Sequence, residues 1–418
     1  MRQYLLLVTA ACLTSGWANA TEWTALGPRA MGMGGAGVAV PQGAESAYWN
    51  PALLGVADSR SGVQIPVGGH FAASGSVLRG AKDLNQVNKD CAAGAAGCTQ
   101  ANIQNALVEL NDPKNGVRGD LGAGAAVKIG RFSVFVTNLT DVGAKPIIDM
   151  ANNTQATVAN NTSSLQLRGI SATEFGLAYG HELPFAPGLS AGAALKGIVG
   201  KVGFQNQSII ASDPGNGALS NFKNSSRTTF QPAVDAGLLW DINRTFTNAR
   251  WKPRIGLAAR DINDPKFKNP DAAIAAGLPS RYSLQGGVRL GAAITPLHFW
   301  NLAADLDLTN NLTAVEGIKS RQFGLGTEVN VFNRSWLNIP LRAGLSKNVA
   351  DSGAKTALTG GVGFEFLHVN LDLAVQTTPA TNTVQTQDKS KKLPNEFSAS
   401  AQIAVLWGGQ DAPAAAAR

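Results

Sequence analysis

The stretch TEFGLAY, residues 173–179, decides the fold class, because its side chains alternate in character with a period of two. One face carries Thr173, Phe175, Leu177 and Tyr179, and the other carries Glu174, Gly176 and Ala178. A period of two over about seven residues is typical of a β-strand with two unlike faces. The stretch therefore predicts a strand with an apolar face and a mixed face.

The same alternation recurs along the chain from about residue 60, for example in GVGFEF (361–366) and LDLAV (371–375). It predicts an all-β protein, apart from QANIQNALVEL (100–110), which has a helical period. Strands are expected near residues 60–77, 119–129, 131–141, 166–181, 189–204, 227–241, 252–262, 281–293, 297–308, 318–332, 336–347, 355–366, 369–378 and 395–407.

Alternation alone does not separate a soluble sandwich from a membrane barrel, but the lengths of the connections do. The links after every second strand are short, such as GR at 130–131 and LPFAPG at 183–188, whereas most others are long and polar. Short turns at one end and long loops at the other are typical of outer-membrane barrels. The chain therefore predicts a single transmembrane β-barrel of about 14 antiparallel strands.

Aromatic residues support this orientation, because six of them lie at strand ends beside the short turns. Amphipathic rings suit a membrane interface, whereas core aromatics would spread along the strands. The six are Trp240, Trp251, Trp300, Trp336, Phe366 and Trp407.

The N-terminus predicts export. Residues 1–20 have a basic start, a short apolar run and an Ala18-Asn19-Ala20 end, which are the features of a cleaved signal peptide. A lipoprotein anchored through Cys12 is a weaker alternative, since the preceding residues match that signal poorly. In an oxidising compartment Cys91 and Cys98 are expected to form a local disulfide.

The stretch RAMGMGGAGVAV (29–40) contains a G-x-G-x-x-G pattern at Gly32, Gly34 and Gly37. A dinucleotide site needs a preceding strand and a following helix, but Pro41 would end such a helix at once. Residues without a side chain can instead pack closely against a wall or adopt a positive φ. We therefore expect a steric role and no cofactor.

No catalytic or metal centre is expected, so the protein is predicted not to be an enzyme. The four histidines (His70, His181, His298 and His368) are far apart, and interfacial positions fit them better than a metal cluster. Asp305 and Asp307 share a face but have no evident nucleophile or metal partner. By strand parity the charged residues expected to face the lumen are Arg168, Glu174, Lys196, Asp235, Arg254, Arg260, Asp305, Asp307, Glu328, Arg342 and Glu365.

Residues 26–54, which include the glycine-rich stretch and a Y-W-N-P-A box (48–52), resemble the FadL-like superfamily of outer-membrane proteins. The ending NPALL, followed by GVQIPVGG, is similar to the barrel-type conjugal transfer protein TraF branch. The resemblance implies a plug folded inside the barrel, with residues 21–58 as plug, 59–407 as barrel and 408–418 as a flexible tail. Its plug residues would be Gly32, Gly34, Gly35, Gly37, Asn50 and Pro51.

The resemblance leaves two functions open. Characterised members of the superfamily carry hydrophobic small molecules from outside into the outer membrane through a lateral opening, whereas other branches serve secretion or assembly. We expect outer-membrane lipid as a partner, with a hydrophobic ligand or protein partners at the external loops. The net charge of +7 includes loop residues Lys266 and Lys268, which either contact lipopolysaccharide phosphates or are simply solvated, and no nucleic-acid partner is expected.

Overall fold

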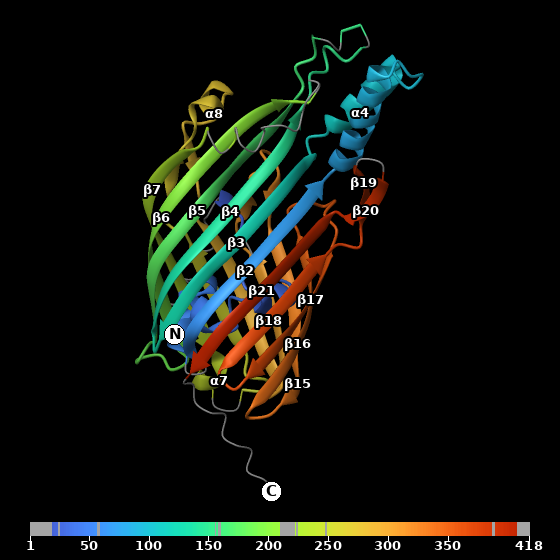
Figure 1. Cartoon of the computed structure of the whole chain (residues 1–418). Coiled ribbons are helices and arrows are strands. Elements are labelled where there is room, and N and C mark those ends of the chain that lie inside the picture. The colour runs from blue at the N-terminus through green and yellow to red at the C-terminus, as the bar shows by residue number, and fades with distance from the viewer. Residues whose placement is uncertain are drawn as a thin grey trace.

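The computed structural model describes residues 19–23, 26–56, 59–154, 156–157, 160–209, 222, 225–246, 249–386 and 389–407. Fourteen strands form a closed barrel in which each strand is antiparallel to its neighbours, and β21 closes on β2 (Figure 1). They are β2 (Ser61–Ser74), β3 (Gly116–Ile129), β4 (Phe132–Ile147), β5 (Ser164–Glu182), β6 (Leu189–Ser208), β7 (Arg227–Asp241), β8 (Arg254–Arg260), β11 (Gly287–Leu297), β12 (Trp300–Asp307), β15 (Gln322–Asn333), β16 (Leu337–Asn348), β17 (Ala357–Phe366), β18 (Val369–Thr377) and β21 (Glu396–Trp407).

The predicted all-β barrel, its strand number and its antiparallel order are confirmed. One strand differs, because the expected strand 281–293 is observed as β11 at Gly287–Leu297. Residues Arg281–Ser283 instead form β10, which pairs with β9 (Lys266–Lys268) in a small hairpin within the loop. Alternation marked both pieces as strand but gave no sign that they belong to different sheets.

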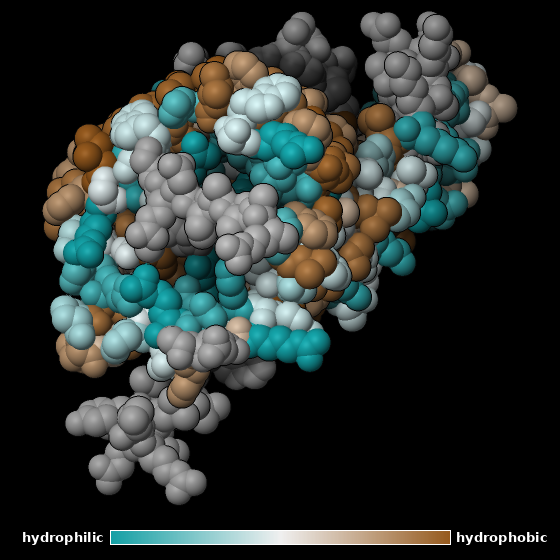
Figure 2. Space-filling view, turned by 90° about the horizontal axis from the view of Figure 1, so that it is seen from below, coloured by the Kyte–Doolittle hydropathy of each residue, from teal (hydrophilic) through white to brown (hydrophobic). Residues whose placement is uncertain are grey.

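The faces of the barrel strands have the polarity of a membrane barrel. In β18, Leu371, Leu373 and Val375 are about half exposed on the outside, whereas Asp372 between them is buried in the lumen. A sandwich would reverse this pattern and bury the apolar face. Figure 2, which views the barrel from the short-turn end, shows hydrophobic residues along much of the outer wall and hydrophilic residues around the central hollow.

The long connections carry small structures of their own at the end opposite to the short turns (Figure 1). Between β2 and β3, α4 (Val77–Ala92) and α5 (Gln100–Leu110) pack as a helical hairpin around Leu84, Ile103 and Leu107. Other loops hold α8 (Asp271–Ala275), the β13 (Asn310–Leu312) and β14 (Lys319–Ser320) pair, and the β19 (Thr381–Thr386) and β20 (Lys389–Pro394) hairpin. Within the described residues, no helix has the length and apolar character needed to cross a membrane.

The N-terminal segment enters the barrel before β2 begins. β1 (Asn19–Thr21) pairs in parallel with β13, and the chain then forms α2 (Pro28–Gly32), η1 (Gly43–Glu45), α3 (Ser46–Trp49) and η2 (Pro51–Gly55). Most side chains between residues 26 and 54 are buried, and these short helices contact several wall strands. We call residues 22–56 the plug. The signal peptide and tail predictions fall on residues 1–18 and 408–418, which are outside the described residues.

Candidate functional site between plug and wall

The glycine-rich stretch lies where the plug backbone touches the barrel wall. Gly34 has a φ of +71°, and a Cβ on it would overlap the carbonyl oxygens of Leu325 and Leu345. On the wall side, Gly326 and Gly344 face the plug backbone equally closely. Plug and wall therefore meet backbone to backbone, which only residues without side chains allow.

The other plug glycines have different surroundings. A Cβ on Gly32 would lie 3.1 Å from the Cβ of Arg342, and one on Gly37 would overlap the Trp49 ring. Gly35 has a φ of +86° but nothing within 4 Å of its Cβ position. The Thr359 hydroxyl of β17 donates to the Gly32 carbonyl (2.9 Å) and accepts from the Gly34 amide (3.0 Å), which ties the plug to the wall.

Asn50 and Pro51 fix the other end of the plug. The Asn50 amide donates to the carbonyls of Val38 (3.0 Å) and Leu238 (3.1 Å), and its Oδ1 accepts from the Ala52 amide at the start of η2. Pro51 starts η2 with its φ already fixed. Its backbone packs against Gly180 and Gly192, on β5 and β6.

An aromatic cluster forms the centre of the plug. Trp23 stacks on Trp49 with ring centroids 6.3 Å apart, and Tyr48 meets Trp49 edge to face at 5.8 Å. Two wall arginines cover this cluster, since the guanidinium of Arg260 lies 4.1 Å from the Tyr48 ring and that of Arg289 lies 4.8 Å from Trp23. These cation–π contacts bind plug to wall without charge on the plug.

A buried ion-pair chain joins α2 to the wall. Arg29 of the plug forms two hydrogen bonds to Glu328, at 2.7 Å and 2.9 Å. Glu328 also accepts from Arg342 at 2.7 Å, and Arg342 reaches Asp372 at 2.6 Å. Because the wall charges are almost fully buried, each depends on its partner.

A second cluster surrounds Lys196, whose side chain is fully buried. Its Nζ lies 3.3 Å from Glu174, 3.0 Å from Asp235 and 2.9 Å from Asp261. Arg260 also reaches Glu174, at 3.3 Å. This group links β5, β6, β7 and β8 within the lumen.

Asp305 and Asp307, which share one face of β12, have separate partners. Asp305 Oδ2 accepts from the amides of Gly37 (2.8 Å) and Val38 (3.0 Å), so it binds the plug. Asp307 instead accepts from Arg289 at 2.6 Å. Both are occupied by structural contacts.

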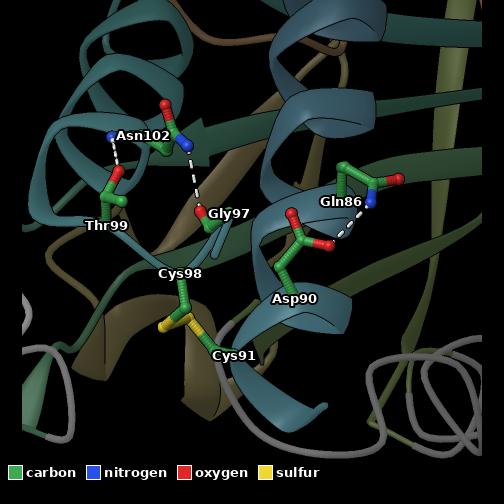
Figure 3. The surroundings of a disulfide bond; sticks show 7 residues. All are labelled: Gln86, Asp90, Cys91, Gly97, Cys98, Thr99 and Asn102. Carbon is green, nitrogen blue, oxygen red and sulfur yellow. Dashed lines mark hydrogen bonds between the residues drawn. A yellow bond between two sulfur atoms is a disulfide. The ribbon is translucent and has the colours of Figure 1, made fainter. Parts of the chain in front are cut away.

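The three remaining residues of the parity prediction also lie on the lumen side. Arg168 stacks on Tyr282 at 4.8 Å, Arg254 pairs with Asp241 at 3.0 Å, and Glu365 accepts from Asn338 at 3.1 Å. Parity thus brought together members of several clusters but gave none of their pairings. Cys91 and Cys98, for which a disulfide was expected, are bonded to each other at the tip of the α4–α5 hairpin (Figure 3).

The sequence analysis missed several lumen residues. Arg118 pairs with Glu22 and with Asp120 (2.8 Å), but it precedes the expected start of its strand at 119. His70 was expected at an interface, yet it lies in the lumen, 2.6 Å from Asp120. Its place in the middle of β2, away from every short turn, was the available signal.

Glu45 of η1 is the buried acid of the plug that lies outside the spanning strands. Its side chain is 4% exposed, and its Oε1 has no hydrogen-bond partner among the described residues. Burial, with a smaller effect from the charge of Asp372, raises the pKa of Glu45 to about 8. Glu45 therefore tends to be protonated in the folded plug.

Three cavities border the plug. Two small ones, about 70 and 60 Å³, share Glu22 and Trp23 in the half near the long loops; the first also touches Leu26, and the second touches Leu139 and Ile170. The third, about 400 Å³, lies at the short-turn end and has a polar lining. Within the described residues, no group of His, Cys, Asp or Glu is arranged to hold a metal ion.

The closed barrel of fourteen strands with N-terminal helices in its lumen defines a FadL-like outer-membrane barrel. Residues 47–307 match the family described as "F plasmid transfer operon, TraF, protein", and this is more than half of the chain. The chain belongs to that family. Both parts of the expected resemblance are therefore confirmed.

Solved structures show the same fold at low sequence identity. The TodX monoaromatic hydrocarbon channel deltaS2 mutant is 12% identical, with a TM-score of 0.50 over 93% of this chain and 100% of that one. The P. putida toluene transporter TodX is 12% identical, with a TM-score of 0.48 over 93% and 99%. The CymD monoaromatic hydrocarbon channel is 12% identical, with a TM-score of 0.48 over 94% and 100%. No curated protein sequence gives a match.

Proposed function

We propose that this protein is a non-catalytic channel that carries small hydrophobic molecules from outside into the outer membrane of a Gram-negative bacterium, after export with a cleaved signal peptide. The observation that carries the proposal is the pair of cavities beside Trp23, whose linings expose more apolar than polar surface. The titles of the structures that share the fold, which name hydrocarbon channels and a toluene transporter, support it.

The plug must yield for this transport to occur. The two cavities measure about 70 and 60 Å³, whereas a dry cavity of about 150 Å³ is known to hold benzene. A monoaromatic ring therefore needs the plug or its side chains to move away from the wall. The cargo would then leave sideways, because the short-turn end offers it a polar cavity.

A disulfide lock on the plug tests the proposal. Gly32 and Gly361 face each other, and a Cβ on either would lie 3.3 to 3.4 Å from the Cα of the other. In the Gly32→Cys/Gly361→Cys variant, oxidation should stop the uptake of labelled toluene and reduction should restore it. Each single-cysteine variant is the matched control. Equal uptake before and after oxidation, with the bond shown by mass spectrometry, would exclude a moving plug as the route.

A second candidate function is a scaffold for conjugal transfer or secretion. Membership of the TraF family and the α4–α5 hairpin, which is pinned by a disulfide and projects beyond the barrel, favour it (Figure 1). Replacement of residues 77–110 by a short linker separates the two functions. A scaffold would lose transfer or assembly and keep normal uptake, whereas a transporter that acts through its lumen would keep transfer.

A further inference from the structure

The polar cavity at the short-turn end has the size of a ligand site. Its volume of about 400 Å³ falls within the range of about 300–1,000 Å³ that small-molecule sites usually have. It lies below the plug, between Gln42 and Gly43 on one side and the lower ends of β15, β16 and β18 on the other. Figure 2 looks at this end and shows hydrophilic residues around the hollow.

Four buried polar atoms of this lining have no hydrogen-bond partner within the described part of the chain. They are Nε2 of Gln42 and Oδ1 of Asn330, Asn338 and Asn370. Gln42 and Asn370 are only 4% and 5% exposed. Because an unpaired buried polar atom is costly, the cavity requires an occupant that bonds to them, and three of the four are acceptors. They call for hydroxyl or N–H donors.

The charges at the cavity favour an anion. Arg29, Arg254 and Arg342 are already paired with carboxylates. Arg60 and Lys252 also line the cavity, and no ion pair to either is present among the described residues. Two cations at the mouth therefore raise the local concentration of anions from the adjoining compartment.

We propose that this cavity binds a small hydroxylated carboxylate, such as a sugar acid, which enters from the short-turn side. The hydroxyl groups supply the donors that the asparagine oxygens lack, and the carboxylate pairs with Arg60 or Lys252. This site is independent of the route for hydrophobic cargo, because the two lie on opposite sides of the plug and have opposite linings.

The experiment compares three probes on the full-length protein in detergent, by isothermal titration calorimetry. D-Glucuronate has both features, glucose has the hydroxyls alone, and acetate has the carboxylate alone. We expect glucuronate to bind about tenfold more tightly than either, since it alone makes both kinds of contact. No saturable glucuronate binding would mean that water alone fills the cavity, and equal binding of acetate would refute the hydroxyl contacts; either result overturns the proposal.

Variants assign the binding to this cavity. Arg60→Gln/Lys252→Gln should weaken glucuronate about tenfold and leave glucose unchanged, because these side chains supply only charge. Lys82→Gln/Lys89→Gln on α4 makes the same charge change at the far end and should have no effect. Asn370→Leu should weaken glucuronate and glucose alike, and its heat-dependent gel mobility reports whether the barrel still folds. Unchanged glucuronate affinity in the first double variant would overturn the proposal.

Discussion

Gly34 and Gly35 form a matched pair that tests backbone packing of the plug against the wall. Both have a positive φ, so Gly34→Ala and Gly35→Ala share a backbone strain of about 1–2 kcal/mol. Both also share an offsetting gain of about 0.4–1 kcal/mol from a less flexible unfolded chain. They differ in space, because the new Cβ meets two wall carbonyls at Gly34 and nothing at Gly35.

The difference between the two variants measures the contact itself. Overpacking against groups that cannot move aside costs about 1–3 kcal/mol, and the carbonyls of Leu325 and Leu345 are fixed within barrel strands. We therefore expect Gly34→Ala to be about 1–3 kcal/mol less stable than Gly35→Ala. Gly34→Val should go further and disturb barrel assembly or gating.

Urea unfolding of the detergent-solubilised barrel, followed by the fluorescence of the buried plug tryptophans, gives the two free energies. Hydrogen exchange of residues 28–40 shows whether the loss arises at the plug. If the two alanine variants differ by less than about 0.5 kcal/mol, which is the usual effect of an ordinary surface change, the plug does not pack against the wall as described.

Four further outcomes are expected. Glu328→Leu should destabilise the protein by about 3–5 kcal/mol in urea, because it strands two arginines, whereas Arg29→Leu should cost less, since Glu328 keeps its wall partner. The raised pKa of Glu45 means that its stabilising effect is complete below about pH 4.5 and is lost as pH rises towards 8, so Glu45→Gln should gain relative stability across that window; parallel pH profiles would contradict this. Cys91→Ser/Cys98→Ser should speed proteolysis of the α4–α5 tip without changing the barrel's unfolding midpoint. The barrel should migrate differently on gels before and after boiling, and identical mobility would argue against a closed barrel.

The strands were predictable because their signal is local. Each lipid-facing strand alternates within about ten residues, and the turns differ in length at the two ends. The error at Arg281–Ser283 has the same origin, since a three-residue hairpin strand alternates like the edge of a barrel strand. Helix α4 was also missed, although Val77, Gly80, Leu84 and Val87 follow a helical spacing, because the search for strands set the period.

The candidate site was predictable only by side. Parity gives the face on which a charge lies, and Arg289 could have been found in the same way, since it lies in a predicted strand. Parity says nothing of height along the barrel or of the partner. Arg29 and Arg118 were missed because the first lies in the plug, where no period applies, and the second lies before its expected strand.

The sequence by itself determined the architecture of this protein: a barrel with a polar lumen, short turns at one end and a glycine-rich segment that could only pack tightly or turn. These follow from patterns that neighbouring residues carry together. Only the tertiary structure decided which charges meet. Arg29 and Glu328 stand 299 positions apart, and their contact depends on the path of the plug and the register of every strand between them. Closure of the barrel sets that register, and no local segment contains it.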